Sequence, residues 1–98
     1  MNYSDRYPSL VYLLRCYFNQ DFDLLFGDAE GAIAAYKAQE ASEEQLQMKK
    51  EIEHLLRLSL TDDELDDVLL NTFDCNYYYP NEWNSSKEWL GYIHNQVS

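Results

Sequence analysis

Apolar side chains recur at helical spacing along most of this chain, and no stretch alternates between apolar and polar residues like a half-buried strand. In the first such stretch Leu10, Leu14 and Tyr17 share one face, and further apolar residues widen it until most of the helix is apolar. A helix of that kind is usually the buried one, so we place it at the centre. The pattern predicts a single all-α domain, a small bundle of about five helices covering residues 9–18, 28–39, 42–59, 61–73 and 85–97.

Capping signals mark where these helices begin. Pro8 is placed to start the first helix after a short polar lead, and Asp28 is a good N-cap for the second. Three further starts carry a capping box, in which two side chains each bond the other residue's backbone amide. The boxes pair Ser42 with Gln45, Thr61 with Glu64, and Ser85 with Glu88.

The connector between the first two helices, residues 17–27, is densely aromatic and carries no positive charge. Connectors are normally built from small polar residues, so this one is expected to pack into the body of the protein, with an extended backbone. Asp21 and Asp23 stand on alternate positions within it. They either bond backbone groups, face a positively charged partner, or hold a hard cation such as Mg²⁺.

The charge balance restricts what the protein binds. Its 98 residues include eighteen acids against seven bases, a formal net charge of −11. Such a surface repels nucleic acid and anionic lipid and suits a basic partner, although solubility alone would also explain it.

The cysteines and the start of the chain point to a compartment. Cys16 and Cys75 are too few for a disulfide framework, so we expect both to be reduced and structural, Cys16 as a small hydrophobe within its helix. We find no secretory signal and no apolar run long enough to span a bilayer. The sequence therefore predicts a cytoplasmic protein.

Acidic residues are concentrated on the fourth helix and in the loop after it. Between residues 58 and 86 the chain has seven acids and neither lysine nor arginine. Acids in a first helical turn are favourable with the helix dipole, which accounts for the residues at 62–64 without any function. Asp66 and Asp67 lie beyond that turn, and Asp63 and Asp67 lie opposite the apolar face. This group is a candidate for contact with a partner.

The loop after that helix contains three consecutive tyrosines, Tyr77–Tyr79, followed by Trp83. The run either caps one end of the bundle as core or forms an interface, because Tyr and Trp supply contact area at little entropic cost. Both can hold, since adjacent side chains of an extended segment point in opposite directions.

The residues give little support to catalysis. His54 and His94 have no metal-ligand neighbour at a helical spacing that also faces inward, and both are expected to be solvated. No base pairs with either cysteine, and there is no glycine-rich phosphate loop. We therefore predict no catalytic residue, metal or cofactor, and a protein that acts by binding. The enzymatic alternative is a carboxylate–metal hydrolase that uses Asp21 and Asp23.

Several motifs occur here in the order found in one known family. They are the segment Tyr17-Phe18-Asn19-Gln20-Asp21-Phe22-Asp23, the capped acidic helix, the Tyr77–Pro80 segment and Glu88-Trp89-Leu90. In this order they resemble the CdiI-type immunity proteins of bacterial contact-dependent growth inhibition, over nearly the whole chain. The family pattern at the first motif reads Tyr-Phe-His-Gln-Asp-Trp-Asp, and this chain departs from it at Asn19 and Phe22. The motif residues expected to serve the fold or the interface are Tyr17, Phe18, Gln20, Asp21, Phe22 and Asp23.

The resemblance implies a cytoplasmic, non-enzymatic protein that forms a 1:1 complex with the C-terminal toxin domain of a CdiA effector and blocks it, at the active-site cleft or at an exosite. Such toxins are frequently nucleases, including enzymes that cleave tRNA, and an acidic patch would complement a basic cleft. The alternatives are a small acidic adaptor that binds no toxin, and the hydrolase above. The residues expected to contact the toxin are Asp62, Asp63, Asp66, Asp67, Asp74, Tyr78, Glu82 and Trp83.

Overall fold

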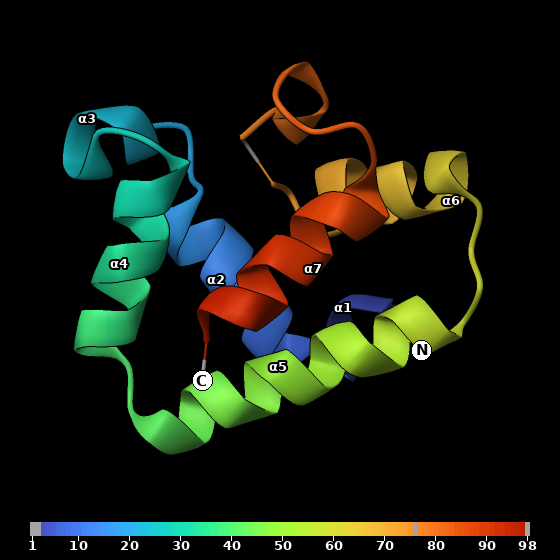
Figure 1. The fold of residues 1–98 in the computed structure, drawn as a ribbon, viewed down its shortest axis with the longest axis horizontal. Helices are drawn as coiled ribbons and strands as arrows, with labels where there is room; N and C mark the ends of the chain where they lie inside the picture. Colours follow the sequence, from blue (N-terminus) through green and yellow to red (C-terminus); the bar gives the residue numbers. More distant parts are fainter. Residues whose placement is uncertain (1–2, 76, 98) are drawn as a thin grey trace.

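The computed structural model describes residues 3–75 and 77–97, apart from the side chains of residues 3, 4, 22, 23 and 81. This part of the chain is mostly helical and contains no strand, so the predicted all-α class is confirmed. No helix within it is long and apolar enough to cross a membrane. Figure 1 shows the elements in order: α1 (Tyr3–Arg6), α2 (Pro8–Tyr17), α3 (Phe22–Phe26), α4 (Ala29–Gln39), α5 (Ser42–Arg57), α6 (Asp62–Asp67), η1 (Val68–Thr72), η2 (Tyr79–Asn81) and α7 (Ser86–Gln96).

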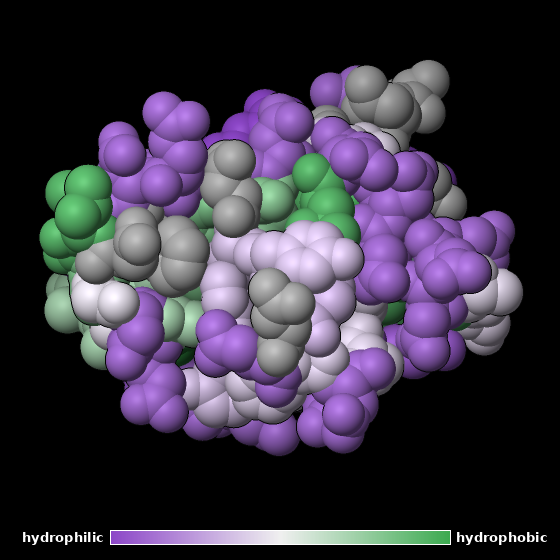
Figure 2. Space-filling model, turned by 90° about the horizontal axis from the view of Figure 1, so that it is seen from above, coloured by the Kyte–Doolittle hydropathy of each residue, from purple (hydrophilic) through white to green (hydrophobic). Residues whose placement is uncertain are grey.

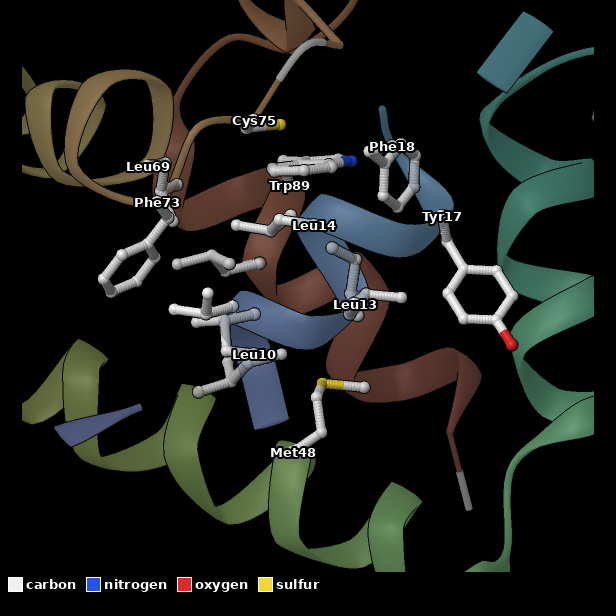
Figure 3. Close-up of a cluster of buried hydrophobic side chains, with 14 of the residues drawn as sticks. Leu10, Leu13, Leu14, Tyr17, Phe18, Met48, Leu69, Phe73, Cys75 and Trp89 are labelled. Atoms are coloured by element: carbon white, nitrogen blue, oxygen red, sulfur yellow. The ribbon is translucent and has the colours of Figure 1, made fainter. Parts of the chain in front are cut away.

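Helix α2 runs through the middle of the molecule, with α4 and α5 packed against it (Figure 1). Leu10, Leu13 and Leu14 are fully buried along it. Figure 3 shows these leucines in one cluster with Met48 of α5 and Trp89 of α7. Each buried leucine side chain contributes about 1.5–3 kcal/mol to folding. The prediction that this helix is the central one is confirmed.

The segment before α2 is more than a polar lead. Tyr7 is buried, its ring packs against Phe73 with centroids 6.1 Å apart, and its hydroxyl is hydrogen-bonded to His54 Nδ1 at 2.7 Å. The buried carboxylate of Glu51 accepts from the amide of Leu10 at 2.9 Å, which satisfies a free amide in the first turn of α2. The expectation that this segment is polar throughout was therefore wrong at Tyr7, because contacts with α5 and with Phe73 bury that residue.

Three helix starts carry the caps that the sequence predicts. The Asp28 carboxylate accepts from the third amide of α4 at 2.8 Å. Thr61 and Glu64 form the complete capping box before α6. Ser85 Oγ accepts from the Glu88 amide at 3.1 Å and caps α7, which is one half of the predicted capping box. A cap of this kind stabilises a helix by about 0.5–2 kcal/mol.

The start of α5 differs from the prediction. Ala41 is the N-cap, without a side-chain hydrogen bond, and Ser42 is already helical. The side-chain amide of Gln45 turns back toward α4 and donates to the carbonyls of Lys37 and Glu40, at 3.1 and 2.9 Å. Carbonyls at the end of a helix lack partners within the helix. The expected Ser42–Gln45 capping box was wrong because Gln45 closes the preceding helix instead.

The fourth predicted helix is divided into two parts. It runs as α6 to Asp67 and then widens into the π-helical turn η1, where the Phe73 amide donates to the Val68 carbonyl at 2.8 Å. Leu65, Val68 and Leu69 face the core, as their spacing predicts, and Phe73 is fully buried at the end of the turn.

His94 is not the solvated side chain that was expected. Its Nε2 lies 2.6 Å from Glu53 Oε2, and this pair of partly exposed side chains joins α7 to α5. The hydrogen bond with His94 is the main cause that lowers the pKa of Glu53. The two residues are 41 positions apart, so local spacing could not reveal the pair.

The two cysteines are free thiols in different surroundings. Cys75 is buried, and burial raises the pKa of its thiol to about 12. Cys16 is exposed, so the expectation that it packs as a small hydrophobe was wrong. It falls on the outward strip of α2 beside Tyr12 and Arg15, which are exposed as well.

Candidate functional site

The aromatic connector projects apolar side chains into solvent. The Asp21 carbonyl accepts from the amides of Leu24 and Leu25, both at 3.0 Å, and so begins the short helix α3 in place of an extended segment. Phe26 packs back on Tyr17, with ring centroids 5.6 Å apart. Leu24 and Leu25, however, are 85% and 62% exposed. The described aromatic residues of the connector pack against the core as expected. The expected extended backbone was wrong, because the connector turns into a short helix that leaves its two leucines in solvent.

The motif shared with the resemblance divides between core and surface. The Asn19 side-chain oxygen accepts from the amide of Asp21 at 3.0 Å and shapes the entry to α3. Among the described residues, no three His, Cys, Asp or Glu side chains gather as a metal site would require. Of the predicted motif residues, Tyr17 and Phe18 are buried, Gln20 and Asp21 are exposed, and the side chains of Phe22 and Asp23 lie outside the described part.

Helix α6 presents most of its carboxylates to solvent. Asp62, Asp63 and Asp67 are exposed, whereas Leu65 faces the core. Asp67 accepts a hydrogen bond from Asn71, one turn later, at 2.7 Å. The chain has no lysine or arginine between residues 58 and 86, so no base of this segment balances these carboxylates.

Asp66 is used inside the protein. Its Oδ1 accepts hydrogen bonds from the hydroxyl of Tyr79, at 2.7 Å, and from the hydroxyl of Ser86. Both of those residues are fully buried, and the Tyr79 ring stacks on Trp89 with centroids 4.6 Å apart. One carboxylate therefore joins α6 to η2 and to the first turn of α7. A contact of Asp66 with a partner stays a prediction, and this geometry gives the residue a structural role.

The tyrosine run alternates between core and surface, as its extended spacing predicts. Tyr77 and Tyr79 are buried, while Tyr78 is 57% exposed. The Tyr77 ring stacks on Phe18 of the connector, with centroids 5.6 Å apart. The run therefore fixes the loop to the core and leaves one large ring available for contact.

The two acids on either side of the tyrosine run differ in their surroundings. Asp74 lies 3.4 Å from Arg15 of α2 in an exposed salt bridge, which contributes about 0–1 kcal/mol. Its backbone φ of 57° lies in the left-handed region that Asp tolerates better than most residues. Glu82 is exposed at the end of η2. The carboxylate of Glu82 is thus the better placed of the two for an external cation.

A cleft of about 260 Å³ opens between the first turn of α4 and η2. Its aromatic lining contains Trp83 and Tyr92, whose rings lie 4.9 Å apart, and the buried Tyr77. Three exposed carboxylates complete it. This grouping was not predicted, because three separate segments build it. The available signal in the sequence was the lack of any lysine or arginine between residues 16 and 36. The acidic members are Asp28, Glu30 and Glu82.

These features lie along one edge of the molecule. We call it the acidic edge, and it consists of α3, the first turn of α4, residues 77–83 and α6, along the top of Figure 1. Figure 2 views this edge from above. Hydrophobic atoms gather at the α3 end, residues of intermediate hydropathy occupy the middle, and hydrophilic atoms cover the α6 end.

The opposite side of the molecule carries a different charge pattern. Arg6, Lys50 and Arg57, three of the seven bases, line a groove between α1 and α5 together with Glu51 and Glu53. Helix α5 forms the lower edge in Figure 1. Negative charge is therefore unbalanced at the acidic edge and partly balanced at α5.

The fold and the acidic edge define an all-α protein whose exposed rings and carboxylates suit contact with another macromolecule. The sequence matches the CdiI immunity protein family over residues 6–97. The chain therefore belongs to the CdiI immunity protein family, and the resemblance seen in its motifs is confirmed.

A solved structure has nearly the same fold. It is a crystal structure of a CdiA-CT/CdiI complex from Y. kristensenii 33638, in which the similar chain is 64% identical with a TM-score of 0.96. The similarity covers 99% of this chain and 98% of that chain. No curated protein matches the sequence.

Proposed function

We propose that this chain is a non-enzymatic immunity protein that binds the C-terminal toxin domain of a cognate CdiA effector in the cytoplasm and blocks its activity. The observation that carries the proposal is the 64% identity, over 99% of the chain, to a protein solved in a CdiA-CT/CdiI complex. The partner is one toxin domain in a 1:1 complex.

The chemistry of the acidic edge suggests how the block would work. A toxin that cleaves RNA needs a basic cleft for phosphates, and carboxylates can occupy the positions where phosphates would bind. Asp62, Asp63 and Asp67 supply exposed charge on α6, and Tyr78 and Trp83 supply rings. We therefore propose a nuclease toxin, most simply an RNase, whose cleft the acidic edge covers.

Growth rescue tests immunity and its target together. The CdiA C-terminal domain encoded next to this chain is induced in bacteria with and without the chain, and growth and total RNA are followed. The proposal expects growth arrest and RNA loss with the toxin alone, and both reversed by the chain. An unrelated toxin domain serves as the control for specificity. Arrest that the chain does not relieve, with no complex formed, would reject immunity; relief without any prior RNA loss would reject only the RNase target.

Charge reversal on α6 tests the proposed surface. Asp63→Lys with Asp67→Lys should slow association with the toxin domain by about tenfold or more, because steering by complementary charge acts on the association rate. The matched control is Asp5→Lys with Glu43→Lys, which makes the same change in net charge at exposed residues of α1 and α5. Equal association rates for the two double variants, measured by stopped flow at low salt, would place the interface away from α6.

A further inference from the structure

The cleft between α4 and η2 is lined by aromatic rings and by carboxylates. Trp83 and Tyr92 are partly exposed and pack together at 4.9 Å with their planes inclined by 40°, so both rings present area to the cleft. Tyr77 closes it from the core side. Burial and the neighbouring Glu82 carboxylate raise the pKa of Tyr77 to about 12. The aromatic surface therefore lies beside fixed negative charge.

The carboxylates of the cleft come from two directions. Asp28 is the N-cap of α4 and Glu30 lies in its first turn, whereas Glu82 directly follows η2. Burial, followed by the charges of Glu30 and Asp28, raises the pKa of Tyr92, as expected for carboxylates close to its ring. Asp28 uses Oδ1 to cap α4, which leaves Oδ2 for a further donor. Of the residues that the structure describes, no lysine or arginine lines this cleft.

We propose that this cleft receives one arginine side chain of the toxin domain, whose guanidinium stacks on the Trp83 and Tyr92 rings and donates hydrogen bonds to the surrounding carboxylates. The proposal rests on the proposed function and names the anchor point of that complex. Aromatic faces attract cations, and most strongly those that shed their water readily. Arginine fits better than lysine because its planar, weakly hydrated guanidinium can stack and bond carboxylates at the same time.

The size and position of the cleft favour this occupant over others. At about 260 Å³ it falls below the roughly 300–1,000 Å³ of typical small-molecule sites, so a single long side chain suits it. An apolar side chain would desolvate three carboxylates without pairing them. The cleft lies between the exposed leucines of α3 and the carboxylates of α6, near the middle of the acidic edge. Interfaces place their strongest anchors near the centre, in aromatic pockets.

Substitutions of the carboxylates and of one ring of the cleft, made in the otherwise unchanged chain, test the proposal. Glu30→Gln with Glu82→Gln, and separately Trp83→Leu, should each raise the dissociation constant for the purified toxin domain by about tenfold or more, mainly through faster dissociation. Glu43→Gln, on the first turn of α5, should change it by less than about twofold. Thermal unfolding of each variant confirms that it is folded. If wild type binds and both cleft variants bind equally well, the cleft is not the anchor and the proposal is overturned; if wild type does not bind, the proposed function fails first.

The identity of the occupant is tested from the toxin side. Each arginine and each lysine of the toxin domain is changed to alanine and measured against wild type and against Glu30→Gln with Glu82→Gln. A direct contact appears as non-additive loss of affinity, and we expect one arginine to couple by about fivefold or more. Coupling to a lysine, or to no cationic residue at all, overturns the assignment.

Discussion

The Asp66→Ala variant tests whether Asp66 has a structural role that the exposed carboxylates of α6 do not have. Asp66 accepts from two fully buried hydroxyls, those of Tyr79 and Ser86. A hydrogen bond to a charged group contributes about 1.5–3 kcal/mol net, and two of them would sum to about 3–6 kcal/mol. The two hydroxyls lie 2.9 Å apart and can bond each other in the variant, which recovers part of this. We therefore expect a loss of about 2–4 kcal/mol in the free energy of unfolding.

For a domain of this size, such a loss lowers the melting temperature by about 8–32 °C, at about 4–8 °C per kcal/mol. Urea unfolding followed by circular dichroism measures the free energy, and an unchanged m-value confirms that both variants unfold as one unit. Asp67→Ala is the matched control: it removes the same charge from the next position, where the carboxylate is exposed, and should cost no more than about 0.5 kcal/mol. If Asp66→Ala costs as little as Asp67→Ala, Asp66 does not hold η2 and α7 against α6, and the reasoning is wrong.

Two further predictions concern α4 and the thiols. A Cβ added at Gly31 would overlap the Phe26 carbonyl oxygen at the end of α3, whereas a Cβ at Gly91 would meet open space. Gly31→Ala should therefore lower the free energy of unfolding by about 1–3 kcal/mol, while Gly91→Ala should raise it by up to about 1 kcal/mol. If urea unfolding shows that both substitutions change the free energy in the same direction, this packing is contradicted. Cys16 is exposed, and burial raises the pKa of the Cys75 thiol to about 12. At pH 8 a thiol reagent should label one site rapidly, Cys16→Ser should abolish that phase, and labelling of Cys75 should require unfolding; a rapid phase that survives in Cys16→Ser would show that Cys75 is accessible.

The helices were predictable because interactions between residues close together in the sequence determine them. Apolar spacing identified the face of α2 that fills the core, and the Thr61–Glu64 pair located the start of α6 to the residue. Alternation in the tyrosine run gave the correct inside and outside positions, since an extended backbone has a period of two. Each of these signals lies within one turn or one strand length of the chain.

The misplaced residues depend on partners far along the chain. The sequence gives no sign that Asp66 differs from its neighbour Asp67. Asp66 is structural because it accepts a hydrogen bond from Ser86, twenty positions later. His94 was expected to be solvated, but in the fold it is hydrogen-bonded to Glu53 of α5. The connector was misjudged for another reason: aromatic composition indicated burial, but two leucines occupy the outward turn of α3. Composition reports what a segment contains and not which side of it faces solvent.

The acidic edge could be anticipated only in part. Stretches without lysine or arginine are visible in the sequence, and the two longest, residues 16–36 and 58–86, contribute to this edge. That a cleft with aromatic walls forms between them depends on how η2 packs against α7 and on where this leaves it relative to the start of α4.

Hydrogen–deuterium exchange of this chain with and without its cognate toxin domain tests the central claim most directly. The account predicts a stable complex in which amides of α3, the first turn of α4, residues 77–83 and α6 exchange more slowly, while the outer face of α5 is unchanged. Slower exchange confined to α1 and α5, or no change at a toxin concentration that would saturate a tight complex, would contradict it.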